Sequence, residues 1–306
     1  MMALVSVILP IYNGVHFIRE SLDSVLAQTF LDYEIICVDD GSTDASVAIL
    51  DEYRPHVTVF RQANAGQGAA RNAGVRQAPG RYVAFIDQDD RWYPWKLERQ
   101  VLALEADPKA VLVHCNSDRM DAEGRVVQRG ATVEEHVRAM ESPLGRLLGE
   151  GLILPSAMLV RREMFERAGG FDPELRGYED FDLCARLKQE GRFVFLDEPG
   201  MCYRVHSGGF TRAGGHAVVR SRERFLKNMM TLYAADTAKR RIVYMLLAEC
   251  YSDWGMDEMR AGNFRDAHIM LRRSVQCNPR KFRTYSRLVR ALWSRVFSSK
   301  SERVHS

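Results

Sequence analysis

The sequence lacks the features that mark secreted, zinc-binding or membrane-spanning proteins. Its six cysteines are scattered and form no Cys-x-x-Cys pair, which argues against a zinc site or a disulfide framework and fits a reducing cytoplasm. The first residues contain no basic stretch ahead of an apolar one, so no signal peptide is predicted. The longest apolar run of the C-terminal half, Ile242 to Tyr251, is too short to span a bilayer. We therefore expect a cytoplasmic protein that is soluble or lies at the inner face of a membrane.

The sequence also lacks an excess of either charge sign. Its 43 basic and 40 acidic residues give a net charge of +3, which supplies no electrostatic argument for a nucleic-acid partner. Hydrophobic residues at 46% and charged residues at 27% are ordinary for a globular protein. The 306 residues are enough for one large α/β domain and a smaller appendage.

Strand-like and helical patterns alternate up to residue 90. This alternation predicts a mostly parallel sheet covered by helices, with all strand carboxyl ends at one edge, where ligands bind. The predicted strands of this part are 5–9, 34–38, 57–60 and 82–86, and the predicted helices are 18–26, 47–53 and 68–77. Shorter strands at 111–114, 125–127, 157–160, 193–196 and 202–205 are expected to complete the pocket, and the pattern beyond Gly215 is wholly helical.

Three polar clusters follow predicted strands and are expected to meet at that edge: 10–13, 39–44 and 87–90. The third holds Asp87, Asp89 and Asp90 directly after an apolar strand. Carboxylates packed this closely repel one another unless a cation neutralises them, and oxygen ligands suit Mg²⁺ or Mn²⁺. The alternative is a solvated acidic turn that caps the next helix.

Two other enzyme classes share parts of these motifs. The segment Gly66 to Arg71 resembles a dinucleotide-binding loop, but Arg71 stands at the third glycine position and the motif follows the third strand. Phosphatases of the haloacid dehalogenase type carry an Asp-x-Asp motif, but on their first strand and with Thr or Val where Asp90 stands. The small residues before Arg71 instead favour a helix packed closely on the sheet, with Arg71 either reaching a phosphate or base or solvated at the surface.

Two later segments contain groups suited to acid–base and anion chemistry. Asp180 lies between Glu179 and an aromatic residue, and a carboxylate at such a pocket wall can have the raised pKa of a general base. Acids in the first turn of a helix also favour the helix dipole without any catalytic role. Arg204 and His206 precede two glycines, so they could bind a diphosphate or a metal beneath a loop that orders over a ligand.

The ordered set of motifs closely resembles family 2 of the inverting glycosyltransferases over roughly residues 4 to 212. The resemblance implies an α/β fold of the GT-A type with a mostly parallel, Rossmann-like sheet. It also implies a nucleotide-diphosphate sugar donor, with a UDP-sugar expected, and a divalent metal, Mn²⁺ or Mg²⁺. The segments that carry it are 7–13, 39–44, 70–74, 85–90, 169–172, 179–180 and 203–206.

The resemblance assigns roles residue by residue. Asp87 and Asp89 become the metal-binding pair, with Asp90 leaving open which two of the three acids bind, and Asp180 becomes the general base. Glu179 and Trp92 are placed on the acceptor side. The residues placed around the donor nucleotide and diphosphate are Pro10, Tyr12, Asp39, Arg71, Arg204 and His206, with Asp39 on the base.

The resulting hypothesis is an enzyme that moves a hexose-type sugar to a hydroxyl of a glycan or lipid-linked acceptor, in cell-surface polysaccharide synthesis. Attack from the face opposite the leaving diphosphate would invert the anomeric carbon. The competing hypothesis is a non-catalytic module that binds a nucleotide sugar and recruits a partner through its helical tail.

The C-terminal residues are predicted to form a separate helical part. We expect a catalytic domain over 1–212 and a helical extension over 213–306, with tetratricopeptide-like spacing around 248–290. The extension could cap the catalytic domain, bind a protein partner or form a homo-oligomer. Its last segment, from Arg283 to Lys300, is basic and amphipathic enough to lie on an anionic membrane, or is a solvated helix end.

Overall fold

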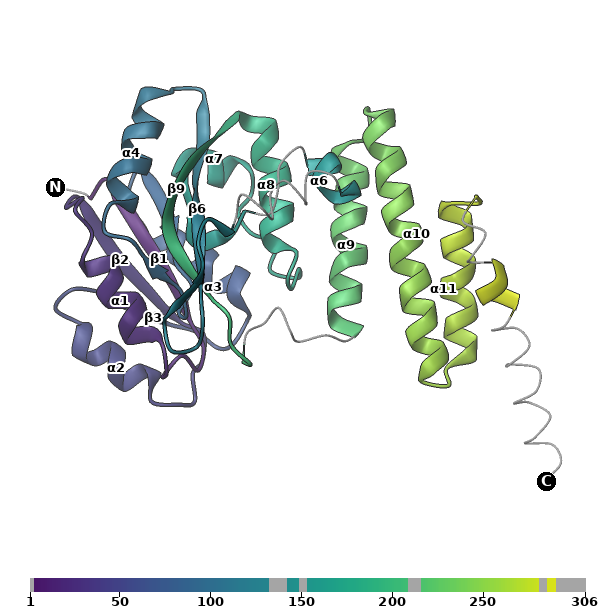
Figure 1. The fold of residues 1–306 in the computed structure, drawn as a ribbon, viewed down its shortest axis with the longest axis horizontal. Coiled ribbons are helices and arrows are strands. Elements are labelled where there is room, and N and C mark those ends of the chain that lie inside the picture. Colours follow the sequence, from purple (N-terminus) through teal and green to yellow (C-terminus); the bar gives the residue numbers. More distant parts are fainter. Residues whose placement is uncertain (1–2, 132–141, 149–152, 209–215, 281–284, 290–306) are drawn as a thin grey trace. The chain divides into compact units, whose positions relative to one another are not determined.

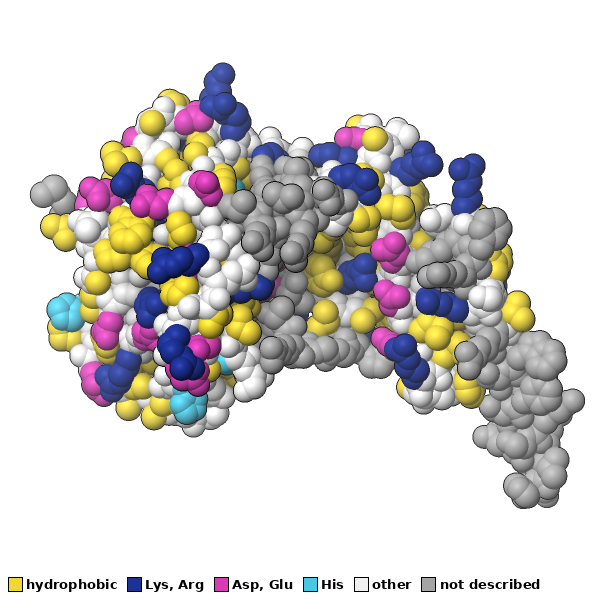
Figure 2. Space-filling model, in the orientation of Figure 1, with side chains coloured by type: hydrophobic (Ala, Val, Ile, Leu, Met, Phe, Trp, Pro, Cys, Tyr) yellow, Lys and Arg dark blue, Asp and Glu magenta, His cyan; other side chains and the backbone are white. Residues whose placement is uncertain are grey.

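The computed structural model describes residues 3–131, 142–148, 153–208, 216–280 and 285–289. The chain divides into two compact units, Met1–Ala213 and Gly214–Ser306 (Figure 1). In the face seen in Figure 2, acidic and basic side chains lie intermixed over the first unit, in keeping with the balanced charge.

The first unit begins with the parallel strands that the sequence predicts. β1 is buried along its whole length because its residues are almost all apolar and it lies between two neighbours. The parallel strands are β1 (Val5–Ile11), β2 (Tyr33–Asp39), β3 (Thr58–Arg61) and β4 (Tyr82–Phe85), in the order β3-β2-β1-β4. The helices between them are α1 (Ile18–Leu26), α2 (Ser46–Tyr53) and α3 (Gln67–Gln77).

The sheet continues beyond β4 with a change of direction. β8 (Met158–Arg161) runs antiparallel to both β4 and β6 (Ala110–Met120), and β6 pairs in parallel with β9 (Arg192–Arg204). β5 (Arg91–Trp92) lies along β9, and β7 (Val126–Gln128) pairs with β6. The mostly parallel sheet is therefore confirmed. The two strands expected at 193–196 and 202–205 are instead one strand, because register shifts around Asn116 let β9 follow β6 past its irregular part.

Helices cover both faces of this sheet (Figure 1). Along β1, Val7 and Leu9 join the core under α1 and α4 (Lys96–Ala106), whereas Ile8 joins the core under α3 and α8 (Glu179–Glu190). A Cβ at Gly74 in α3 would lie 2.5 Å from Ile8 Cγ2, so the close helix approach expected from the small residues is confirmed. In the described part of this unit, the remaining helical segments are η1 (Pro155–Ala157), α6 (Pro143–Leu148) and α7 (Arg162–Arg167).

The second unit is helical, as expected. It contains α9 (His216–Leu232), α10 (Thr237–Arg260) and α11 (Phe264–Cys277). A Cβ at Gly255 would lie 2.7 Å from Leu271 Cγ, so glycine permits the close packing of α10 on α11. Among the described residues, no helix combines the length and apolar character needed to cross a bilayer. Most of the basic segment from Arg283 to Lys300, with Trp293, lies outside the described residues.

Candidate functional site

The three polar clusters meet at the carboxyl edge of the parallel strands. The amide of Gln88, in the loop after β4, exchanges two hydrogen bonds with the backbone of Tyr12, at 2.9 and 3.1 Å. Asn13 accepts a bond from the Thr43 N–H at 2.8 Å and its own N–H donates to Ser42 Oγ at 3.0 Å. The expectation that these loops form one region is confirmed.

At the end of β2, Asp39 is nearly buried, with one carboxylate oxygen accepting from the Ser42 N–H at 3.0 Å. Its other oxygen accepts from Arg61 Nε at 3.2 Å. Arg61 ends β3 in register with Asp39, and most of its side chain is exposed. Tyr12 is 47% exposed, whereas Pro10 is buried within β1. Arg61 was not among the site residues predicted from the sequence, although its position at the end of a predicted strand could have indicated it.

The acid loop, residues 87–90, holds its three carboxylates in different surroundings. Asp90 is buried, and its carboxyl group accepts from Ser156 Oγ at 2.6 Å and from the Arg204 N–H at 3.1 Å. Burial, together with the charges of Asp89 and Asp87, holds the pKa of Asp90 well above its ordinary value. Asp90 is therefore a structural member of the loop, whereas Asp89 pairs with His206 and Asp87 with Arg71.

Asp89 is partnered by His206, whose Nε2 lies 2.9 Å from Asp89 Oδ2. Burial and then Asp87 raise the pKa of Asp89, while His206 opposes that rise. Adjacent ligands in an octahedral shell with bonds of about 2.1 Å lie about 3 Å apart, so this carboxylate–imidazole pair fits Mg²⁺ or Mn²⁺. The described residues contain no cluster of three or more His, Cys, Asp or Glu side chains that would hold a metal. A two-ligand site suits a cation that takes its other ligands from phosphate and water.

Asp87 faces a buried arginine. Arg71 is 1% exposed, and its Nη2 lies 2.5 Å from Asp87 Oδ1 while its Nη1 lies 3.7 Å from Glu179 Oε1. The placement of Arg71 near the nucleoside is corrected, because α3 directs the side chain inward, against the ring of Phe171 and between carboxylates. Among the described residues, Arg71 Nε and Nη1 have no hydrogen-bond partner.

Asp180 lies at the start of α8, beside this cluster. Burial, followed by the adjacent Glu179, raises the pKa of Asp180 to about 7, and the Phe181 N–H and Arg71 oppose the rise. Glu179 is buried, with Oε2 accepting from the Gly177 N–H at 2.6 Å. The arrangement thus combines a carboxyl group that titrates near neutrality with a guanidinium that also contacts the acid loop.

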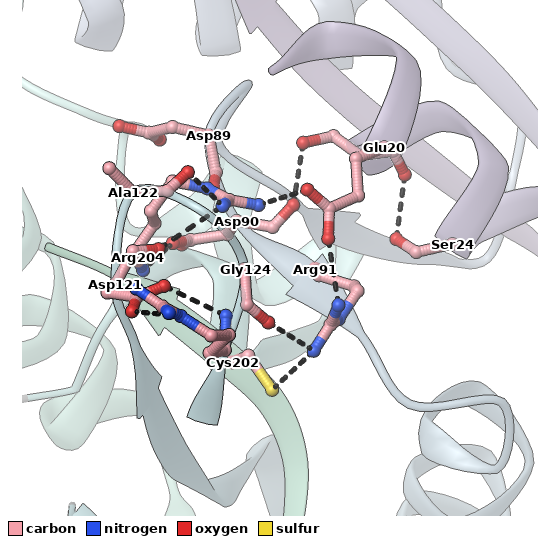
Figure 3. Close-up of polar contacts among 12 residues, drawn as sticks. Glu20, Ser24, Asp89, Asp90, Arg91, Asp121, Ala122, Gly124, Cys202 and Arg204 are labelled. Atoms are coloured by element: carbon pink, nitrogen blue, oxygen red, sulfur yellow. Dashed lines mark hydrogen bonds and ion pairs between the residues drawn. The ribbon is translucent and has the colours of Figure 1, made fainter. Parts of the chain in front are cut away.

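Two further sequence assignments are wrong. Trp92 is 3% exposed, donates through Nε1 to Ser156 O at 2.9 Å and packs against the Lys96 ammonium, so it cannot line an acceptor surface. Arg204 is 1% exposed on its side chain, and the protein already engages its guanidinium (Figure 3). It therefore cannot bind the diphosphate directly, because none of its three nitrogens faces an open site.

Ser21 and Ser156 support the acid loop and were not found from the sequence. Ser21 Oγ lies 2.6 Å from Asp90 O and 2.8 Å from Gln88 O. Ser156 Oγ donates to Asp90 and also accepts from the Asp87 N–H at 3.0 Å. Neither serine belongs to a motif, since each reaches the loop only through the tertiary fold.

Comparison with known proteins gives consistent matches for the first unit. Residues 6–169 match the family model described as Glycosyl transferase family 2. An uncharacterized glycosyltransferase of Rickettsia typhi, RT0329, is 33% identical over 210 residues, which cover 68% of this chain and 66% of that protein. The uncharacterized glycosyltransferase EpsJ of Bacillus subtilis is 36% identical over 230 residues, which cover 69% of this chain and 64% of that protein. The matches thus span about two thirds of the length of these relatives.

Solved structures resemble the fold. TarS residues 1–349 of S. aureus, in complex with UDP-GlcNAc, superpose with a TM-score of 0.71 at 20% identity, covering 99% of this chain and 92% of that one. The mannosyltransferase PcManGT of Pyrobaculum calidifontis, in complex with GDP-Man and Mn²⁺, gives a TM-score of 0.59 at 20% identity. The superposition covers 96% of this chain and 86% of that one. With the family model matching more than half of the sequence and the GT-A fold present, the chain belongs to glycosyltransferase family 2.

Proposed function

We infer that this protein is an inverting glycosyltransferase that moves a sugar from a nucleotide-diphosphate donor to a hydroxyl group of an acceptor. The observation that carries the proposal is the position of Arg71, whose guanidinium pairs with Asp87 and acts through its charge on Asp180. It puts a carboxyl group suited to proton transfer next to the loop that carries the Asp89–His206 pair. A proton acceptor beside a cation-binding pair is what a sugar transfer with a diphosphate leaving group requires.

The donor's base would lie at Asp39 and Arg61. The carboxylate offers an acceptor and the exposed guanidinium offers donors beside it. A ring N–H next to a carbonyl oxygen, as in uracil, complements that pair, whereas the corresponding edge of cytosine presents an unprotonated nitrogen to the carboxylate. Tyr12 is half-exposed and directly follows Ile11, which pairs with Asp39 in the sheet, so it supplies an aromatic surface. These features favour a UDP-sugar, in agreement with the UDP-GlcNAc bound by TarS.

Asp89 and His206 would hold the divalent cation, in agreement with the Mn²⁺ bound by PcManGT. When bound, the cation offsets the negative charge that develops on the leaving diphosphate. Asp87 contributes through Arg71, which neutralises one of its oxygens and holds the loop in place.

Asp180 would accept the proton of the attacking hydroxyl. A base is most effective when its pKa lies near the working pH, and the burial of Asp180 brings its pKa to about 7. The deprotonated hydroxyl attacks the anomeric carbon on the face opposite the diphosphate, so the configuration inverts. A glycan or lipid-linked acceptor, a role in polysaccharide synthesis and contact of the basic C-terminal segment with a membrane remain part of this proposal.

A panel of nucleotide sugars in a thermal-shift assay, with and without Mn²⁺, tests the proposal. A donor that binds only the folded protein raises its stability by about 2.7 kcal/mol at a hundred times its dissociation constant. We expect a shift with UDP-sugars that requires Mn²⁺, followed by release of UDP when an acceptor is added. Binding without turnover over a broad acceptor panel would favour the non-catalytic module.

A further inference from the structure

Arg204 is a buried cation whose contacts all go to structural groups around the acid loop. Its Nε donates to Asp89 O at 2.8 Å, and Nη1 lies 3.0 Å from Ala122 O and 3.3 Å from Asp121 O (Figure 3). Its Nη2 is paired with Glu20, and its backbone N–H donates to the Asp90 carboxyl group. One residue thus ties the acid loop to the turn after β6.

The same residue is connected to His206 through α1. The ring of Phe17, the residue before α1, lies 4.7 Å from Arg204 Cζ and 4.8 Å from the His206 ring, which meets it edge-on. His206 follows Arg204 by two residues, so the guanidinium and the imidazole pack against one aromatic side chain. The position of His206 relative to Asp89 therefore depends on how Arg204 and Phe17 are held.

Glu20 holds this arrangement from α1. One of its oxygens pairs with Arg204, and the other accepts from Arg91 Nη1 at 2.8 Å (Figure 3). Without the carboxylate, the Arg204 guanidinium would be a buried charge lacking its counter-ion, which is strongly unfavourable, so the side chain would have to move. Its contact with Asp89 O would move with it.

We propose that Glu20 and Arg204 are positioning residues that fix the Asp89–His206 pair for a divalent cation. This rests on the proposed function, since it takes that pair as the cation site. Residues that orient metal ligands typically contribute 10- to 100-fold to metal affinity. No sequence motif includes Glu20, and it contacts neither Asp89 nor His206 side chains directly.

The test is the Mn²⁺ affinity of the full-length protein, measured without a nucleotide. Mn²⁺ is titrated into wild type, Glu20→Gln and Arg204→Lys while the paramagnetic broadening of the His206 imidazole signals is followed by NMR. We expect both variants to need about 10-fold more Mn²⁺ for half-maximal broadening. Glu20 is partly exposed, so its variant is expected to fold, and the thermal midpoint of each protein is measured alongside.

Glu105→Gln is the matched control. Glu105 is also a partly exposed carboxylate that accepts from an arginine, Arg81, but it lies beside Tyr82 at the opposite end of β4 from the acid loop. We expect its Mn²⁺ titration to match that of wild type. If Glu20→Gln and Arg204→Lys also match within twofold, the positioning role is wrong while the cation site stands. If the wild-type His206 signals do not respond to Mn²⁺, the cation site of the proposed function is wrong.

Discussion

The two sides of the acid loop are held by two buried arginines in opposite ways. On one side, Arg71 pairs with Asp87 and approaches Glu179, yet its Nε and Nη1 make no hydrogen bond to any residue that the structure describes. On the other side, every nitrogen of the Arg204 guanidinium has a partner, and most of these are backbone carbonyls. Arg71 is thus surrounded mainly by carboxylates, and Arg204 mainly by backbone carbonyl groups.

This difference indicates that the two sides of the acid loop have different functions. The Arg71 side contains the carboxyl group of Asp180, whose pKa is raised to about 7, so charge there depends on pH. The Arg204 side fixes the Asp89–His206 pair, so geometry matters most there. Substitutions on the first side should therefore change chemistry and its pH dependence, and substitutions on the second should change binding.

The largest effect is expected for Asp180→Asn. Turnover should fall by about two to four orders of magnitude, the range for loss of a general base, because the amide cannot accept the proton. The dissociation constant for UDP with Mn²⁺ should stay nearly unchanged, since the substitution leaves the Asp89–His206 pair intact. Steady-state kinetics measures the turnover, and calorimetry measures the dissociation constant for UDP. If the variant kept wild-type turnover, another residue would have to be the general base, and Glu179 would be the first candidate.

Removing Arg71 should also cost stability. Arg71→Met leaves Asp87 and Glu179 without their shared cation, and breaking a buried pair typically costs about 3–5 kcal/mol. Urea denaturation of the variant and of Arg99→Met measures the difference. Arg99 is exposed and meets Glu198 only at 3.9 Å, so its removal should change the unfolding free energy little. Equal losses would show that Arg71 stabilises nothing specific.

The pH profile should follow Asp180. The active form has the ionised carboxylate, so turnover should rise tenfold per pH unit below about 7 and level off above it. The folded-state pKa lies above the ordinary 3.8, so the unfolding free energy should fall as pH rises from about 4 to 7, by up to about 1.4 kcal/mol per unit. In Asp180→Asn that part of the fall should be absent. A turnover profile flat between pH 5 and 8 would contradict the assignment.

Trp92→Phe should have the smallest effect. It removes the bond to Ser156 O, worth about 1 kcal/mol, and keeps most of the aromatic packing beside Lys96. Because Trp92 is buried, the KM for the acceptor should not change. A rise of tenfold or more in the KM for the acceptor, at unchanged donor affinity, would show that Trp92 contributes to acceptor binding after all.

The sequence was sufficient for features that depend on local pattern. The parallel strands, the helices between them and the meeting of polar loops at one edge follow from alternating periodicity and crossover handedness. The inward direction of Arg71 and the burial of Trp92 could not be predicted, because they depend on how α3 and β5 pack in three dimensions. Glu20 reaches Arg204, and Ser156 reaches the acid loop, from segments distant in the sequence, so no local signal marks either residue.

We propose that Asp89 and His206 bind a nucleoside diphosphate through a divalent cation. This binding mode can be measured by calorimetric titration of UDP into wild type and Asp89→Ala, each in Mn²⁺ and in EDTA. We expect wild type to bind UDP at least tenfold more tightly in Mn²⁺ than in EDTA, and the variant to show no such difference. Equal UDP affinity of wild type in Mn²⁺ and EDTA, or an undiminished Mn²⁺ effect in Asp89→Ala, would contradict the claim.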